Sequence, residues 1–302
     1  MDLKSKIILV YGPTASGKSE FAVKLAKKIN GEIINADSIQ VYKDFKILTA
    51  RPLKKNYQKI KHHLYGYQDG RENFSTGDWL KLAITKINEI KKRKKIPILV
   101  GGTGLYFKAL IDGLVEIPKI PLELRHKVRK LQKEFGQKKF YKELLKIDPY
   151  LVDQIRSTDV QRSIRAYEVK IHTKKSILEW HRNTKSNFRK REFFKIIIDF
   201  PRPSLIEKID ARTVKMLESG SINEVKKFLK LKISKEKSLS KAIGIHEIDL
   251  FLKKKIDKKN LIEKISIKTR QYAKRQMTWA RGHMINWKKI KSNRLDNFLK
   301  KI

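Results

Sequence analysis

The chain has 302 residues, 40% of them hydrophobic, which is enough to bury a core in one compound domain or two modest ones. Lysine and arginine total 72 against 31 acidic residues, and the net charge of +41 favours polyanions such as nucleic acid, although solvated surface lysines also raise it. The absence of cysteine excludes disulfides, a cysteine nucleophile and thiolate zinc sites, and no apolar run is long enough to span a membrane, so we expect a cytoplasmic protein.

The first hundred residues alternate between short apolar runs and amphipathic stretches. We expect strands at Ile7–Tyr11, 32–36 and 96–100, and helices at about 18–29 and 77–93. This alternation predicts a parallel sheet with helices on both faces. Ligands bind such sheets at the carboxyl ends of the strands, so Gly12, Asp37 and Gly101–Thr103 are expected to converge on one crevice.

The character of the chain changes near Pro118. From Leu122 to about 187 the sequence is charged and helical, and an apolar run at 194–200 then predicts one more strand before further helices. The simplest layout is an α/β core formed by residues 1–118 and 190–302. A helical insertion domain, residues 119–189, interrupts this core.

The turn after the first strand carries the pattern G-x-x-x-x-G-K-[ST] between a strand and a helix, so we expect a P-loop NTPase-like sheet. Its glycines let backbone N–H groups face a phosphate, and the helix N-terminus adds partial positive charge. Lys18 supplies a cation, and the hydroxyl of Ser19 is a ligand for Mg²⁺. The pattern indicates a polyphosphate, whether a nucleotide or another diphosphate. The expected diphosphate contacts are Gly12, Thr14, Ala15, Ser16, Gly17, Lys18 and Ser19.

Two further polar segments follow strands. Asp37 stands directly after the second strand, where it can hold Mg²⁺ through water, cap the following turn or act as a general base; the residues leave these three roles open. After the third strand, Gly101-Gly102-Thr103-Gly104 permits close backbone approach and brings the hydroxyl of Thr103 to the site. Glycine turns of this kind are also often only structural.

Two basic segments are candidates for RNA contact. In the helical run 270–282, Arg270, Lys274 and Arg281 are spaced by four and seven residues and share one face. In the run 159–166, Gln161 and Arg165 share a face. An ordinary amphipathic or solvated helix is the alternative interpretation of each.

Taken together and in order, these segments resemble the tRNA dimethylallyltransferases, also called tRNA isopentenyltransferases. The resemblance covers nearly the whole chain. The matching segments are GPTASGKS (12–19), ADSIQVY (36–42), TARP (49–52), FSTGDW (74–79), GGTGLYFKAL (101–110), DVQRSIRAYEV (159–169) and RQYAKRQMTWARG (270–282).

The resemblance implies transfer of a dimethylallyl group from dimethylallyl diphosphate to N6 of the adenosine 3′-adjacent to the anticodon in tRNA, with release of pyrophosphate. The P-loop then holds a prenyl diphosphate in place of ATP, and Lys18, Mg²⁺ at Ser19, and Arg212 neutralise the leaving group. Asp37 becomes the favoured general base, and Thr103 helps to position the reacting atoms. The adenine has to leave its stack to reach the crevice.

The same resemblance implies that the insertion domain and the C-terminal helices bind the tRNA anticodon stem-loop. No coiled-coil heptad or long apolar seam calls for a dimer, so we expect a monomer, and the lack of a segment of spanning length predicts no membrane contact. The residues implied in tRNA binding are Asp37, Ser38, Ile39, Gln40, Thr103, Arg125, Gln161, Arg162, Ser163, Ile164, Arg165, Lys241, Gly244, His246, Lys274, Arg275, Gln276, Thr278, Trp279 and Arg281.

Four residues depart from the family pattern. Ile245 and His246 stand where a tyrosine and a basic residue are usual, Gly66 where an aspartate is usual, and Lys174 where a glycine is usual. The adjacent His62 and His63 have no carboxylate at metal-ligand spacing, so we expect them to be structural or surface residues.

Two other functions compete with the prenyltransferase. A P-loop kinase of a small metabolite would bind ATP but not tRNA. A non-catalytic RNA-binding module would account for the charge but would leave the P-loop, Asp37 and Thr103 unused.

Overall fold

The structure is a computed structural model that describes residues 3, 5–182 and 184–302. Its chain divides into two compact units. The larger unit contains Met1–Ile111 and Phe188–Ile302, and the smaller contains Asp112–Asn187. From the sequence we expected the insertion domain to span residues 119–189.

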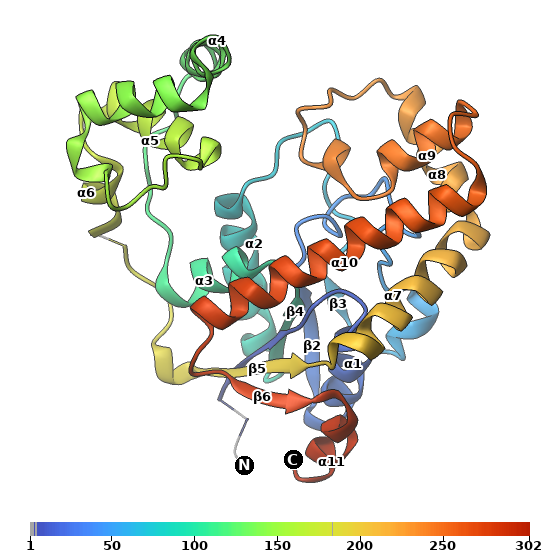
Figure 1. Cartoon of the computed structure of the whole chain (residues 1–302). Coiled ribbons are helices and arrows are strands. Elements are labelled where there is room, and N and C mark those ends of the chain that lie inside the picture. The colour runs from blue at the N-terminus through green and yellow to red at the C-terminus, as the bar shows by residue number, and fades with distance from the viewer. Residues whose placement is uncertain (1–2, 4, 183) are drawn as a thin grey trace. The chain divides into compact units, whose positions relative to one another are not determined.

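The larger unit is built on a parallel sheet of six strands in the order β3-β2-β4-β1-β5-β6 (Figure 1). The strands are β1 (Ile7–Tyr11), β2 (Gly31–Asn35), β3 (His62–His63), β4 (Ile96–Gly101), β5 (Phe193–Asp199) and β6 (Lys288–Lys291). This sheet confirms the predicted α/β architecture. The two edge strands, β3 and β6, were not predicted.

Alternation along each buried strand sends side chains to two separate cores. Ile7 and Leu9 of β1 pack on one face against helices that include α2, α3 and α10. Ile8 and Val10 pack on the other face against α1 and α11. The helices of this unit are α1 (Lys18–Ile29), α2 (Thr76–Lys92), α3 (Gly104–Asp112), α7 (Arg202–Met216), α8 (Ile222–Lys230), α9 (Ile245–Leu252), α10 (Lys258–His283) and α11 (Leu295–Lys300).

The smaller unit is helical and has its own apolar clusters. It consists of α4 (Leu122–Ile147), α5 (Val160–Thr173) and α6 (Ile177–Arg182). Gly136 interrupts α4 with a φ of 67°, and Asp159 caps α5 by accepting a hydrogen bond from the N–H of Arg162. Lys174 ends α5 in a left-handed conformation, with a φ of 60°, which explains why glycine is the usual residue there.

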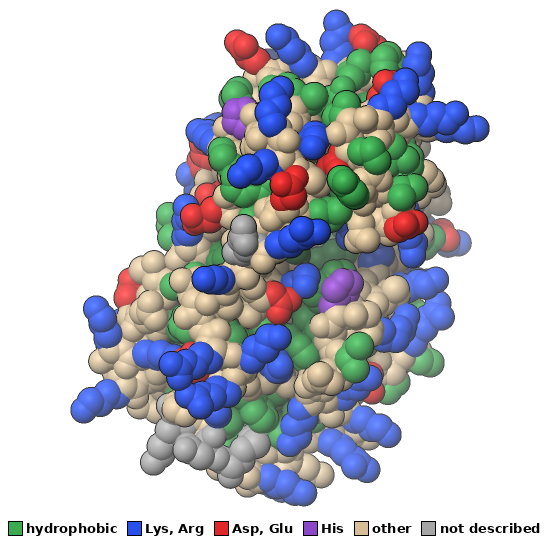
Figure 2. Space-filling model, turned by 90° about the vertical axis from the view of Figure 1, so that its left-hand side faces the viewer, with side chains coloured by type: hydrophobic (Ala, Val, Ile, Leu, Met, Phe, Trp, Pro, Cys, Tyr) green, Lys and Arg blue, Asp and Glu red, His purple; other side chains and the backbone are tan. Residues whose placement is uncertain are grey.

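Basic side chains cover much of the surface. Figure 2 shows lysine and arginine spread over one face of the molecule, among fewer acidic groups. Across residues 3, 5–182 and 184–302, none of the helices combines the length and apolar character that crossing a membrane requires.

Candidate active site

The P-loop joins β1 to α1 with the backbone curled inward. Ala15 and Gly17 adopt left-handed conformations, with φ angles of 63° and 79°, which is the kind of turn that gathers successive N–H groups around an anion. At Gly12 a Cβ would lie 2.7 Å from the hydroxyl of Ser16. Ser16 is buried, and its hydroxyl has no hydrogen-bond partner within the described part of the chain, so it is available to a ligand.

Three charged side chains influence one another beside this loop. Burial lowers the pKa of Lys18 to about 8, and nearby Asp37 opposes this shift while Arg212 of α7 adds to it. Burial also lowers the pKa of Arg212, again against the influence of Asp37. All three line one cavity of about 510 Å³. The structure therefore brings together two cations and one carboxylate from separate segments of the chain.

Asp37 is held rigidly at the end of β2. The side chain of Asn35 accepts a hydrogen bond from the N–H of Asp37 at 3.0 Å and donates one to its carbonyl at 3.0 Å. One carboxylate oxygen of Asp37, Oδ1, accepts from the N–H groups of Ile39 at 3.0 Å and Gln40 at 3.3 Å, so the turn-capping role is present. The other oxygen, Oδ2, has no hydrogen bond to any described residue and is free for a ligand.

Thr103 reaches the site through Ser38. Its hydroxyl accepts a hydrogen bond from the N–H of Ser38 at 2.9 Å, and its own N–H donates to the carbonyl of Ala36 at 3.2 Å. Gly101 makes this approach possible, because a Cβ there would lie 1.9 Å from the carbonyl oxygen of Ala36. The ends of β2 and β4 are thereby locked together.

The cavity has an apolar side as well as a charged side. Leu48, Met216, Ile243 and Ile265 line it together with the ring of Tyr272. A diphosphate at the P-loop would therefore have its organic group facing a wall of hydrocarbon.

Glu224 of α8 was missed by the sequence interpretation. Its carboxylate accepts hydrogen bonds from the N–H groups of three successive residues, Lys46, Ile47 and Leu48, at 2.9–3.0 Å. The amide of Gln40 donates to the carbonyl of Thr49 at 2.9 Å in the same loop. No local pattern marks Glu224, because its partners lie more than 170 residues away in sequence.

Helix α10 presents several of the predicted tRNA contacts at its surface. Lys274, Arg275, Thr278 and Arg281 are exposed. Arg270, in contrast, makes a bidentate ion pair with Asp210 of α7, with its closest contacts at 2.9 Å.

Two other predicted residues of α10 face the interior. Trp279 is half-buried, packs against Gly104, where a Cβ would lie 2.1 Å from its ring, and stacks on His283. Gln276 is buried, and its side-chain amide bonds to the backbone at Thr14 and Gly102.

The segment before α9 lies beside the cavity. Lys241 and His246 are exposed, and Lys241 lines the cavity. Gly244 is buried with a φ of 103°, and a Cβ there would lie 2.7 Å from Leu48. Ile245, where the family usually has tyrosine, is buried in the core and directs no polar group to the surface.

In the smaller unit, predicted tRNA contacts surround one buried carboxylate. Arg125 Nε and Arg165 Nη1 each lie 3.8 Å from an oxygen of Glu168. Burial raises the pKa of Glu168, although the nearby arginines act to lower it. Gln161 and Arg162 are exposed, whereas the side chains of Ser163 and Ile164 are buried.

The remaining departure, Gly66, has a steric explanation. Its φ is 57°, and a Cβ there would lie 1.8 Å from Nη1 of Arg51, whose guanidinium occupies the space of a side chain. That guanidinium donates to the carbonyl of Tyr42 at 3.0 Å.

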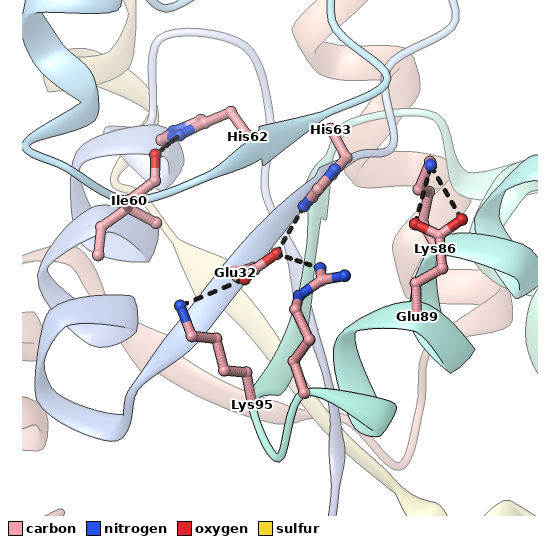
Figure 3. Close-up of polar contacts among 8 residues, drawn as sticks. Glu32, Ile60, His62, His63, Lys86, Glu89 and Lys95 are labelled. Atoms are coloured by element: carbon pink, nitrogen blue, oxygen red, sulfur yellow. Dashed lines mark hydrogen bonds and ion pairs between the residues drawn. The ribbon is translucent and has the colours of Figure 1, made fainter.

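The two adjacent histidines have structural partners. His62 stacks on Tyr57, and His63 bonds to Glu32 of β2 (Figure 3). No cluster of three or more potential metal ligands from His, Cys, Asp and Glu occurs among residues 3, 5–182 and 184–302.

Comparison with known proteins gives consistent similarities. Residues 40–283 match the profile of a family described as IPP transferase. The chain is 60% identical to a tRNA dimethylallyltransferase of Pelagibacter ubique over 302 residues, covering 100% of this chain and 96% of the relative.

Solved structures are similar over the same length. A tRNA isopentenylpyrophosphate transferase from Bacillus halodurans shares 31% identity with a TM-score of 0.70, covering 98% of this chain and 95% of the other. A eukaryotic dimethylallyltransferase acting on tRNA shares 29% identity with a TM-score of 0.83, covering 95% and 74%.

Proposed function

The chain belongs to the IPP transferase family, and from this premise we propose how its residues perform the transfer of a dimethylallyl group to tRNA. The reaction moves this group to N6 of the adenosine 3′-adjacent to the anticodon, and the donor we propose is dimethylallyl diphosphate. The observation that carries the donor assignment is the cavity itself. It joins a phosphate-binding loop with Lys18 and Arg212 on one side to an apolar wall on the other.

In the proposed reaction, N6 of the adenine forms a bond to C1 of the dimethylallyl group while the C1–O bond to the diphosphate breaks. The electron pair of that bond leaves with pyrophosphate, whose added negative charge Lys18 and Arg212 stabilise. The N6 amine is a weak nucleophile because its lone pair is delocalised into the ring. We assign the proton it loses to Oδ2 of Asp37, the carboxylate oxygen that is not used to cap the turn.

The residues present suit a magnesium ion bound mainly by the substrate. The hydroxyl of Ser19 and the carboxylate of Asp37 are oxygen donors lining the same cavity as the P-loop. Mg²⁺ commonly takes one or two protein oxygens and completes its shell with phosphate oxygens and water. Bound there, the ion would supply further charge neutralisation for the leaving pyrophosphate, and Ser19 would hold it.

For tRNA, we propose that the exposed cations of α10 and of the smaller unit contact backbone phosphates. Lys274, Arg275 and Arg281 are exposed on α10, and Gln161, Arg162 and Arg165 are exposed on α5. Arg162 Nη1 lies 3.2 Å from Asp159, and Arg165 Nη1 lies 3.8 Å from Glu168. The three cations of α10 make no ion pair with a described residue, so we propose that they attract the anticodon stem-loop more strongly. We propose that the enzyme acts as a monomer in the cytoplasm.

The test is incubation of the protein with Mg²⁺, labelled dimethylallyl diphosphate and unmodified tRNA, followed by nucleoside analysis. We expect label in N6-prenyladenosine. An Asp37→Asn variant keeps the size of the side chain and an oxygen for the cap but cannot accept the proton. It should lose at least 100-fold in turnover, on the order of a general-base contribution, while binding tRNA normally.

The competing kinase predicts a different result. If no label transfers while ATP is bound tightly or hydrolysed, the prenyltransferase assignment is wrong. Normal turnover by Asp37→Asn would remove Asp37 as the base while leaving the reaction intact.

A further inference from the structure

A single buried glutamine connects helix α10 to the loops of the active site. Gln276 is 5% exposed and lies in the middle of the exposed basic residues of α10. A buried amide needs hydrogen-bond partners for both its donor and its acceptor, and without them its burial on the packed face of a helix costs free energy. Its position therefore calls for a specific explanation.

Both ends of this amide bind backbone groups of catalytic loops. Oε1 of Gln276 accepts a hydrogen bond from the N–H of Thr14 in the P-loop at 2.8 Å. Nε2 donates to the carbonyl of Gly102, next to Thr103, at 2.9 Å. One side chain thus spans the ends of β1 and β4, which α10 crosses (Figure 1).

The surroundings are shaped to accept this amide. A Cβ at Gly102 would lie 2.1 Å from Nε2 of Gln276, so only glycine leaves space for the contact. The hydroxyl of Tyr11, the last residue of β1, donates to the main-chain carbonyl of Gln276 at 2.8 Å. Tyr272, one turn earlier on α10, lines the cavity.

We propose that Gln276 is a positioning residue that fixes the P-loop and the Gly102–Thr103 turn against the helix that binds tRNA. The inference rests on the proposed function in taking α10 as an RNA-contacting helix. Lys274, Arg275 and Thr278 lie within two residues of Gln276 and point to the surface. Any displacement of α10 would therefore act directly on the loop to which we assign the diphosphate.

The chemistry of an amide is required because one donor and one acceptor must point to different loops. Methionine has nearly the same length but supplies neither, so the N–H of Thr14 and the carbonyl of Gly102 would lose their partner. An ionised glutamate can accept from Thr14 but repels the carbonyl of Gly102. Protonated glutamate can again both donate and accept.

The experiment compares Gln276→Met and Gln276→Glu with Ser266→Ala. Ser266 is a matched control, because it is buried on the same helix and its hydroxyl has no partner among the described residues. Thermal unfolding establishes that each variant is folded. The dissociation constants for dimethylallyl diphosphate without tRNA and for tRNA without donor are then measured, followed by kcat across pH.

We expect Gln276→Met to weaken donor binding about tenfold and to lower kcat, with the tRNA dissociation constant within about twofold of the wild type. Ser266→Ala should change none of these. For Gln276→Glu, kcat relative to the wild type should rise as the pH falls and the carboxyl becomes protonated. This recovery holds even if Gln276→Met does not fold.

Two results would overturn the proposal. Weaker tRNA binding with unchanged donor binding would make Gln276 an RNA contact instead. Variants of Gln276 that behave like Ser266→Ala at every pH would leave it no positioning role. Donor binding is measured without tRNA, so a failure of this inference is distinguishable from a failure of the proposed reaction.

Discussion

Glu32 of β2 is fully buried, and its carboxylate is surrounded by three basic side chains (Figure 3). His63 Nε2 and Arg93 Nη2 lie 2.8 and 2.7 Å from Oε2, and Lys95 Nζ lies 3.3 Å from Oε1. Burial acts to raise the pKa of Glu32, but the hydrogen bonds from these groups outweigh it and lower the pKa from 4.5 to about 2. We predict that Glu32→Gln destabilises the fold in a pH-dependent way.

The size of the effect follows from the two pKa values. The difference between 4.5 and about 2 corresponds to about 3 kcal/mol of folding stability at pH 7. Because the pKa is lower in the folded state, this stability is complete above pH 4.5 and is lost as the pH falls through 2. At pH 3 the same linkage leaves about 1 kcal/mol. Arg93 and Lys95 are 38% and 34% exposed, so water solvates them in the variant and no stranded cation adds to the loss.

The assay is urea denaturation of the wild type and Glu32→Gln at pH 7 and pH 3. Glu89→Gln is the control, because Glu89 and Lys86 lie together on the surface of helix α2 and pair at 2.9 Å (Figure 3). Exposed pairs of this kind contribute little, so we expect no measurable change there. A loss for Glu32→Gln no larger than for Glu89→Gln, or equal at both pH values, would refute the reasoning.

Three further outcomes follow from the site. The pKa of Lys18 is lowered to about 8, so its positive charge is present below that pH. We therefore expect the affinity of the free enzyme for the donor to fall as the pH rises above 8. Donor titrations between about pH 6.5 and 9.5 that give a constant affinity would contradict this. Glu224→Gln replaces one carboxylate oxygen with an amide donor that faces backbone N–H groups. We expect urea denaturation to show a free energy of unfolding lower by about 1–3 kcal/mol, and kinetics to show a raised KM for the donor. Glu218→Gln, at an exposed position, should change neither. Arg281→Ala should weaken tRNA binding mainly at low salt and reduce the slope of log K against log salt by about one, and a salt-independent loss would exclude a phosphate contact.

The central strands could be predicted because their own residues define them. Strands β1 and β4 are almost entirely apolar, and β2 has two adjacent isoleucines at Ile33 and Ile34. Glycine or a polar turn residue comes soon after each strand, and the order of the strands along the chain implies where their ends meet. The edge strands carry no such pattern. β3 has two histidines and β6 has one buried residue, Ile290, so each exists through its pairing with β2 or β5.

The residues of the site were predictable where chemistry is local and not where it depends on distant partners. The P-loop has its spacing in the sequence, and its curl is present in the structure. Arg270 has the spacing of a phosphate contact, yet its charge is paired with Asp210, 60 residues away. Helical spacing also cannot show that Gln276 faces inward, because the faces of an amphipathic helix are decided by what packs on it.

The roles left open for Asp37 are compatible with one another, because its two carboxylate oxygens have different surroundings. Oδ1 accepts the N–H groups of Ile39 and Gln40, which fixes the plane of the carboxylate. Asn35 holds the main chain of Asp37 from behind, so neither the backbone nor the side chain has to reorganise during the reaction. A base is effective only when its free oxygen is aimed at the proton it takes. The cap therefore orients Oδ2, and this structural role supports the catalytic role that we propose for Asp37.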